Sequence, residues 1–109
     1  MVDLSSPRSV HIVGIGGAGM SAIATVLAAM GHRVTGSDLK ASAGLERLRA
    51  LGVGVAVGHA AGNLGDVDLV TISTAVQPSN PELVAANERG ITVVRRAEML
   101  ASKNETATI

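Results

Sequence analysis

Four residue types are missing from this chain of 109 residues: cysteine, phenylalanine, tyrosine and tryptophan. The absence of cysteine excludes disulfides within the chain and fits a reducing compartment. Because aromatic side chains are absent, Val, Ile, Leu, Ala and Met must fill the core, and a bound base cannot stack on an aromatic ring of this chain. A chain of this length forms one domain that can bury a proper core.

An excess of charge of either sign is also missing. Nine basic and nine acidic side chains give a formal net charge of zero, and no basic run is longer than Arg95-Arg96, which argues against a nucleic acid or an anionic membrane surface as partner. The apolar stretch from Ile23 to Met30 is far too short to span a bilayer. Residues 1–7 lack the charged start and apolar core of a secretion signal. We therefore expect a soluble cytoplasmic domain.

What the sequence does contain is a strand, a glycine-rich turn and a helix in immediate succession, between Ser9 and Met30. Residues 10–13 include a short β-branched run, and good helix formers follow the turn up to Gly31. Four glycines stand in the six residues of the turn, more than a plain connection between strand and helix needs. They are Gly14, Gly16, Gly17 and Gly19.

The spaced glycines have separate uses in such a turn. Gly14 can adopt the backbone conformation of a sharp turn, Gly16 lets N–H groups approach a diphosphate, and Gly19 lets the helix pack closely on the strand. The first N–H groups of a helix lack intrahelical partners and carry the positive end of its dipole, so an anion is favoured here. The alternative is that the glycines only make a tight turn. The predicted diphosphate contacts are Gly14, Gly16, Gly17, Ala18, Gly19, Met20 and Ser21.

Helical and strand patterns alternate along the rest of the chain. Strands are predicted at residues 10–13, 33–37 with Asp38 closing the strand, 53–57, 68–73 and 91–94, and helices at 17–30, 45–51, 81–88 and 95–101. Ser42 and Asn80 are the predicted N-caps, and Gly31 ends the first helix as a left-handed cap. Short right-handed crossovers then give a Rossmann-like α/β fold, an open parallel five-stranded sheet in the order 3-2-1-4-5 with helices on both faces.

Two buried features are expected within these elements. Side chains at a spacing of three and four residues should form one buried face of the first helix: Met20, Ile23, Ala24, Leu27 and Met30. His11 lies inside the first strand. It is either hydrogen-bonded at a face of the sheet or in contact with a ligand or a partner domain.

Polar residues follow the strands at their carboxyl ends, where the strand order reverses and open α/β sheets bind ligands. We expect Asp38 to accept hydrogen bonds from a ribose or a base, with its carboxylate about one nucleoside away from the glycine turn, unless it is only a turn or capping residue. His59 follows the third strand and is either a site residue or a loop histidine in water. Ser73 and Thr74 stand at the carboxyl end of the fourth strand, beside the first strand.

These features bind a ligand but do not transform one. The sequence has no Ser/His/Asp arrangement, no cluster with metal-ligand spacing and no phosphate loop that carries a lysine. Two interpretations remain open at this point. One is a free-standing nucleotide-sensing domain or an NAD(P)-binding domain of a dehydrogenase, and the other is a nucleotide-sugar-binding domain of a larger enzyme.

The run from His11 to Ser21 resembles the start of the Mur ligase family. Further stretches that are similar to the family are residues 36–38, 58–59, 73–76, 80–82 and 96–100, so that the resemblance covers about residues 8–101. It implies an N-terminal domain that binds the UDP part of UDP-N-acetylmuramate, in an ATP-dependent ligase that adds L-alanine in peptidoglycan-precursor synthesis. By position it implies that the glycine turn meets the diphosphate. The implied uridine contacts are Ser37, Asp38, His59, Ser73 and Thr74.

The same resemblance implies what this chain lacks. The family's central domain, which carries the ATP loop and the magnesium sites, and its C-terminal amino-acid-binding domain are absent from the sequence. We therefore expect a lead-in at residues 1–8, a UDP-sugar-binding domain at 9–101 and a tail at 102–109. No catalytic residue, metal site or cofactor is expected in the chain, which should be inactive by itself.

Overall fold

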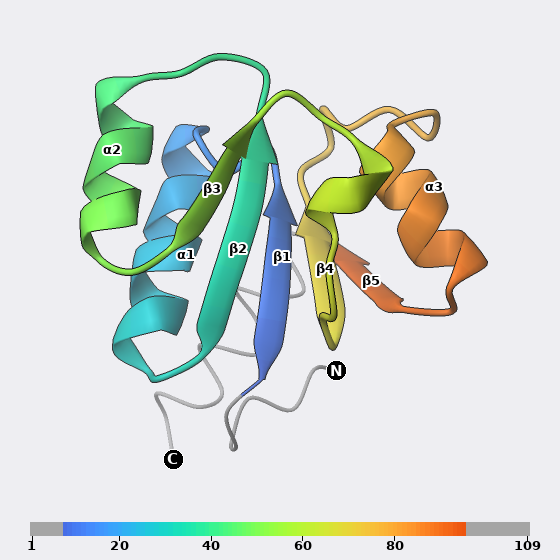
Figure 1. Ribbon diagram of the computed structural model, residues 1–109, viewed down its shortest axis with the longest axis horizontal. Coiled ribbons are helices and arrows are strands. Elements are labelled where there is room, and N and C mark those ends of the chain that lie inside the picture. The colour runs from blue at the N-terminus through green and yellow to red at the C-terminus, as the bar shows by residue number, and fades with distance from the viewer. Residues whose placement is uncertain (1–7, 96–109) are drawn as a thin grey trace.

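The computed structural model describes residues 8–95, which form an open five-stranded sheet with helices packed against it (Figure 1). The strands are β1 (Ser9–Val13), β2 (Arg33–Asp38), β3 (Gly54–Val57), β4 (Leu69–Ile72) and β5 (Thr92–Arg95). The helices are α1 (Ala18–Ala29), α2 (Ala43–Ala50) and α3 (Pro81–Glu88), with a short 3-10 helix, η1 (Ala61–Asn63).

The strand order is β3-β2-β1-β4-β5, and all four pairings are parallel. The predicted order and fold class are confirmed. β1 lies at the centre, where Ile12 is opposite Gly36 of β2 on one side and Thr71 of β4 on the other. The chain adds β2 and β3 on one side of β1 and then crosses to the other side for β4 and β5. The carboxyl ends of β1 and β4 therefore flank the point at which such sheets bind ligands.

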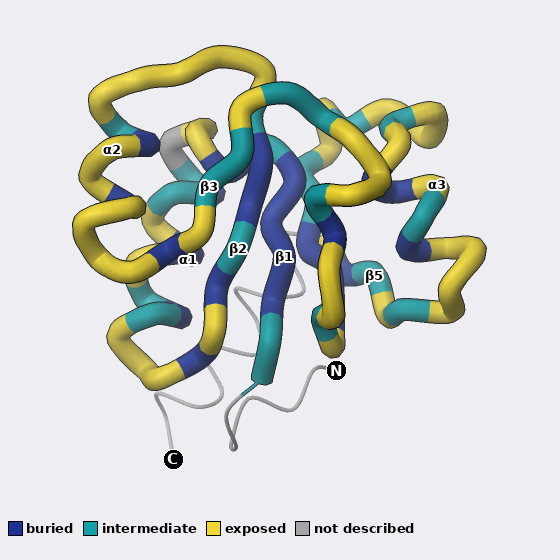
Figure 2. Tube along the Cα trace, in the orientation of Figure 1, coloured by how far each residue is buried: buried dark blue, intermediate teal, exposed yellow. Residues whose placement is uncertain are grey.

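The two faces of the sheet are covered by different elements. Successive strand residues point to opposite faces, so Leu69 belongs to one core cluster and Val70 to the other. Helices α1 and α2 cover the first face with side chains that include Ile23, Leu27 and Leu45. We call this the α1–α2 face. The opposite α3 face is covered by α3 and η1, and Figure 2 shows that most of the central strand β1, between the two layers, is buried.

Local signals set most of the element boundaries. Ser42 caps α2 by accepting a hydrogen bond from the Leu45 N–H, and Asn80 caps α3, as predicted. Gly31 follows α1 with a φ of 91°, the left-handed conformation predicted for it. The predicted buried face of α1 is wrong at one end, because Met30 is the C-cap of the helix and is 38% exposed.

Two other expectations need correction or fall outside the described residues. The segment after β3, predicted as a loop, contains η1. Arg95 is the last residue of β5 rather than the first of a helix, and the rest of the predicted final helix, residues 96–101, lies outside the described residues, as do 1–7 and 102–109. None of the helices within residues 8–95 is long and apolar enough to cross a membrane.

Candidate functional site

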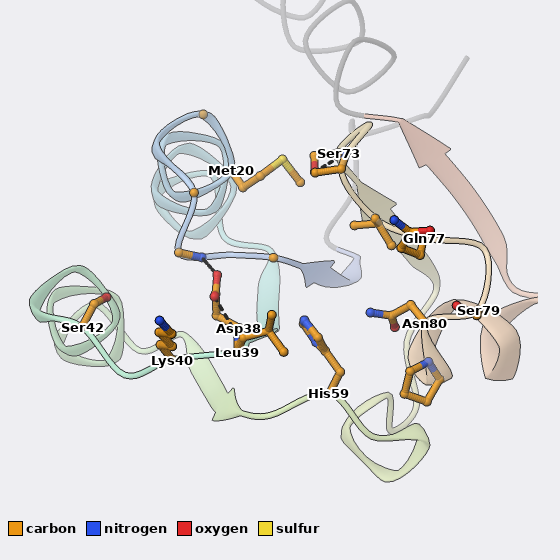
Figure 3. Close-up of a pocket in the computed structure, with 17 residues that line it drawn as sticks. Met20, Asp38, Leu39, Lys40, Ser42, His59, Ser73, Gln77, Ser79 and Asn80 are labelled. Atoms are coloured by element: carbon orange, nitrogen blue, oxygen red, sulfur yellow. Dashed lines mark hydrogen bonds between the residues drawn. The ribbon is translucent and has the colours of Figure 1, made fainter.

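A cavity of about 850 Å³ opens at the carboxyl ends of the strands (Figure 3). Four parts of the chain line it: the glycine turn, the end of β2 with the loop after it, His59 shortly after β3, and the connection from β4 to α3. The predicted site residues that line it are Gly14, Gly16, Gly17, Gly19, Met20, Asp38, His59 and Ser73. The volume suits a small-molecule ligand, and it lies at the predicted crevice.

The glycine turn is fixed to the neighbouring strand by backbone hydrogen bonds. Gly14 has a φ of 79°, and the N–H groups of Gly14 and Ile15 both donate to the carbonyl of Ser37, at 2.8 and 3.0 Å. Gly17 is the N-cap of α1 and makes no side-chain hydrogen bond to the first turn. The N–H groups of that first turn therefore have no side-chain cap, and Gly17, Gly19 and Met20 line the cavity, where free N–H groups of a helix start can donate to an anion.

Asp38 lies against the glycine turn. Its Oδ2 accepts a hydrogen bond from the Gly16 N–H at 2.8 Å, and its Oδ1 accepts one from the Leu39 N–H at 2.8 Å (Figure 3). The expectation that the carboxylate lies one nucleoside away from the glycines is wrong. The register that pairs Val13 with Ser37 places Asp38, the last residue of β2, beside the glycine turn that follows β1.

Beneath the cavity, on the α3 face, lies a network of buried polar side chains centred on Glu82, which is 0% exposed. Its Oε1 is 2.5 Å from His11 Nε2 and accepts the Ser37 hydroxyl proton at 2.6 Å. Its Oε2 accepts hydrogen bonds from the Ala60 N–H at 3.0 Å and from Asn63 Nδ2 at 2.9 Å. One carboxylate thus ties together β1, β2, η1 and α3.

The network holds Glu82 in its ionised form. Burial alone raises the pKa of this carboxyl, but hydrogen bonds from His11, Ser37, Asn63 and Ala60 outweigh burial and lower the pKa to about 2. Hydrogen bonds to a carboxylate stabilise the charged form in this way. His11 is 1% exposed and also bonds Thr35 Oγ1 at 2.9 Å, which confirms the interpretation of a histidine hydrogen-bonded at a sheet face.

The cavity does not bring together every predicted contact. Ser37 is 0% exposed, does not line the cavity, and uses its hydroxyl in the Glu82 network. Thr74 and Ser21 are also outside the lining. His59 lines the cavity and connects it to the network, because its Nδ1 is 2.8 Å from Ser37 Oγ.

Sequence reasoning missed several residues of the site. The lining also includes Leu39, Lys40, Gln77, Ser79 and Asn80, of which Lys40 brings a positive charge. Glu82 was missed as a buried group, although the spacing of Glu82, Leu83 and Ala86 places them on one face of a helix, and all three are buried. Within residues 8–95, no group of three or more His, Cys, Asp or Glu could hold a metal ion.

Comparison with known proteins gives one consistent result. The sequence profile described as "Mur ligase family, catalytic domain" matches residues 9–104. The chain is 62% identical over 101 residues to a UDP-N-acetylmuramate–L-alanine ligase of Allorhizobium ampelinum, covering 90% of this chain and 21% of that protein.

Solved structures agree with the sequence match. The crystal structure of a UDP-N-acetylmuramate–alanine ligase from Thermotoga maritima superposes with a TM-score of 0.88 at 35% identity, over 91% of this chain and 23% of that one. A murein peptide ligase from Psychrobacter arcticus gives 0.81 at 27% identity, over 86% and 20%. The chain spans about a fifth of the length of the curated relatives it matches (21% of the first). By the profile match and these similarities, the chain belongs to the Mur ligase family.

Proposed function

We propose that this chain is the N-terminal domain of a UDP-N-acetylmuramate–L-alanine ligase and that its cavity binds the UDP part of UDP-N-acetylmuramate. The observation that carries the proposal is the cavity between the glycine turn and the polar strand ends, in a chain 62% identical to a ligase of that name. The reaction served would be the addition of L-alanine during peptidoglycan-precursor synthesis.

The diphosphate would bind at the start of α1. The N–H groups of the first turn, residues 18–20, offer hydrogen bonds to phosphate oxygens, and the helix dipole favours a negative charge there. Lys40, which also lines the cavity two residues after Asp38, would add a positive charge. Ser21 would remain a contact through its place in the first turns of the helix.

The nucleoside would lie between Asp38, His59 and Ser73. An ionised carboxylate can accept about four hydrogen bonds. Asp38 accepts two hydrogen bonds, from the Gly16 and Leu39 N–H groups, so it can still accept from a ribose hydroxyl or a uracil N–H. Thr74, which follows Ser73, would contact the nucleoside from the edge of the cavity. Ser37 does not line the cavity and would act only through its hydrogen bond with His59.

The ligase chemistry would need parts beyond these residues. No lysine-bearing phosphate loop stands in the sequence, and residues 8–95 offer no group that could hold magnesium. ATP, magnesium and L-alanine would be bound by the family's central and C-terminal domains, in the cytoplasm. The chain alone would hydrolyse no ATP and form no amide bond.

Calorimetry with UDP-N-acetylmuramate, UDP, uridine and NADH tests the proposal. We expect UDP-N-acetylmuramate and UDP to bind and NADH to bind at least tenfold more weakly. Gly17→Val should block the start of α1 without disturbing the fold, because an added Cβ would meet only Gly14 O at 3.5 Å and Met20 Cγ at 3.9 Å, both ordinary contact distances. It should weaken UDP binding far more than uridine binding. Gly16→Val is unsuitable, since its Cβ would lie 2.7 Å from Asp38 Oδ2.

Gly62→Ala is the matched control, because a Cβ there meets no atom within 4 Å and residue 62 does not line the cavity. It should bind UDP like the wild type. Tight NADH binding without binding of UDP-N-acetylmuramate would overturn the proposal and favour a dinucleotide domain. Unchanged UDP affinity in a folded Gly17→Val variant would move the diphosphate away from the start of α1.

A further inference from the structure

The wall of the cavity and the buried network meet at His59. This side chain is 15% exposed and lines the cavity, and Figure 3 shows its ring directed into the open space. Its Nδ1 faces the other way, 2.8 Å from Ser37 Oγ and 3.4 Å from Glu82 Oε2. Among the described residues, its Nε2 makes no hydrogen bond, so Nε2 is the ring nitrogen that can bond a ligand.

The proton on His59 can be assigned by counting donors. Glu82 is ionised and can only accept, so the single hydroxyl proton of Ser37 points to Glu82 Oε1. Ser37 Oγ must then accept in its contact with His59, which requires a proton on Nδ1. A neutral imidazole with its proton on Nδ1 has a bare lone pair on Nε2.

We propose that Glu82 is a positioning residue which, through Ser37, holds His59 in the Nδ1–H tautomer, so that Nε2 meets the ligand as a hydrogen-bond acceptor. This rests on the proposed function and deepens it. Such an acceptor can bond an N–H or O–H group of a nucleoside, but it cannot donate a hydrogen bond to a phosphate oxygen. His59 then selects the nucleoside, while the start of α1 binds the diphosphate.

The four hydrogen bonds on Glu82 explain why the arrangement holds one tautomer. Its two oxygens accept from Ser37, His11, Ala60 and Asn63, which uses about all the acceptor sites of a carboxylate. The Ser37 hydroxyl cannot turn toward His59 without leaving one of those sites empty and buried, and such an unmade bond is costly.

The test reads the tautomer directly, by long-range ¹H–¹⁵N NMR of the imidazole rings of the full chain without ligand at mildly alkaline pH. In the wild type we expect a protonated Nδ1 and a bare Nε2 on His59. In Glu82→Gln the amide can donate to Ser37 Oγ, which frees the hydroxyl proton for His59 Nδ1. The tautomer should then shift to Nε2–H, and uridine affinity should fall at least tenfold while inorganic pyrophosphate affinity stays within twofold.

His11→Gln is the matched control. It replaces the other donor to the same oxygen, Glu82 Oε1, with an amide that can still donate. Because Glu82, Ser37 and His59 themselves are unchanged, His59 should keep its Nδ1 proton. A wild-type spectrum with the proton on Nε2, or a folded Glu82→Gln variant that keeps both the Nδ1 proton and full uridine affinity, would overturn the proposal. The wild-type spectrum decides even where Glu82→Gln does not fold. If the tautomer is as expected but no uridine compound binds, the proposed function fails and the positioning role of Glu82 stands.

Discussion

The α1–α2 face of the sheet is closed by aliphatic side chains. The α3 face combines an aliphatic cluster with the buried carboxylate of Glu82 and the two histidines beside it, His11 and His59. Both faces cover the same central strand, β1. On the first face burial itself is favourable, at about 25 cal/mol per Å² of apolar surface. On the second, each polar group must find its partner, because a buried group without one costs free energy. The first face is therefore stabilised by burial itself, and the second only through partnered polar groups, which include the contacts of Ser37 and Glu82 with the cavity-lining His59.

The largest effect is expected at Gly36 of β2, where neighbouring atoms leave no room for a side chain on the α1–α2 face. A Cβ at Gly36 would lie 2.5 Å from Ile15 Cδ1 and 2.7 Å from the Ile12 carbonyl oxygen. Because backbone cannot move aside cheaply, Gly36→Ala should lower the free energy of unfolding by about 3 kcal/mol or more. Urea denaturation measures this, with Gly62→Ala as the control. A Gly36→Ala protein as stable as the wild type would show that the strands are not so close.

The next effect concerns acid stability on the α3 face. The pKa of Glu82 is lowered to about 2 from 4.5, so ionised Glu82 stabilises the fold above pH 4.5 and this contribution disappears as the pH falls toward 2. The shift corresponds to on the order of 3 kcal/mol in total, of which about 2 should be lost between pH 5 and pH 3.

Urea unfolding of the wild type and Glu82→Gln at pH 5 and pH 3 checks this prediction. The variant should be less stable at pH 5, and its stability should fall less between the two pH values. If both proteins lost the same stability between pH 5 and pH 3, Glu82 would not be the group that titrates.

Helix capping gives a smaller contrast between the faces. Asn80 accepts from the N–H groups of Glu82 at 2.9 Å and Leu83 at 3.4 Å, whereas Ser42 accepts from Leu45 alone at 3.3 Å. Asn80→Ala should cost about 1–2 kcal/mol and Ser42→Ala about 0.5–1 kcal/mol. Thermal unfolding of the two variants side by side measures the difference. The reverse order would mean that the Asn80 cap does not support the Glu82 network.

The smallest effect is expected on the solvent side of α2. Glu46 and Arg49 form an exposed ion pair, and Arg49 also donates to the Val55 carbonyl at 3.1 Å. Glu46→Gln should change the free energy of unfolding by less than about 0.5 kcal/mol, and the change should shrink in high salt because exposed pairs are screened. Urea denaturation at low and high salt checks this. A loss of more than about 1 kcal/mol in the free energy of unfolding would contradict the prediction, because exposed pairs contribute about 0–1 kcal/mol.

The sequence by itself determined the alternation of strands and helices, the strand order and the caps. Ser42, Asn80 and Gly31 act within a few residues of their own position, and buried parallel strands read as continuous apolar runs wherever they lie. The glycine turn and the carboxyl ends of β2 and β4 were predictable for the same reason. These are local signals, and the connection rules for parallel sheets convert them into an arrangement in space.

Only the tertiary structure decided how those polar residues are used. Glu82 lies 71 residues from His11 and 45 residues from Ser37 along the chain, and Asp38 meets Gly16 across 22 residues. Such contacts depend on the strand register and on how α3 lies against the sheet, and both are set by the packing of the whole domain. No local pattern states whether a serine at a strand end faces a ligand or a buried carboxylate, because its rotamer follows from neighbours that only the fold brings together.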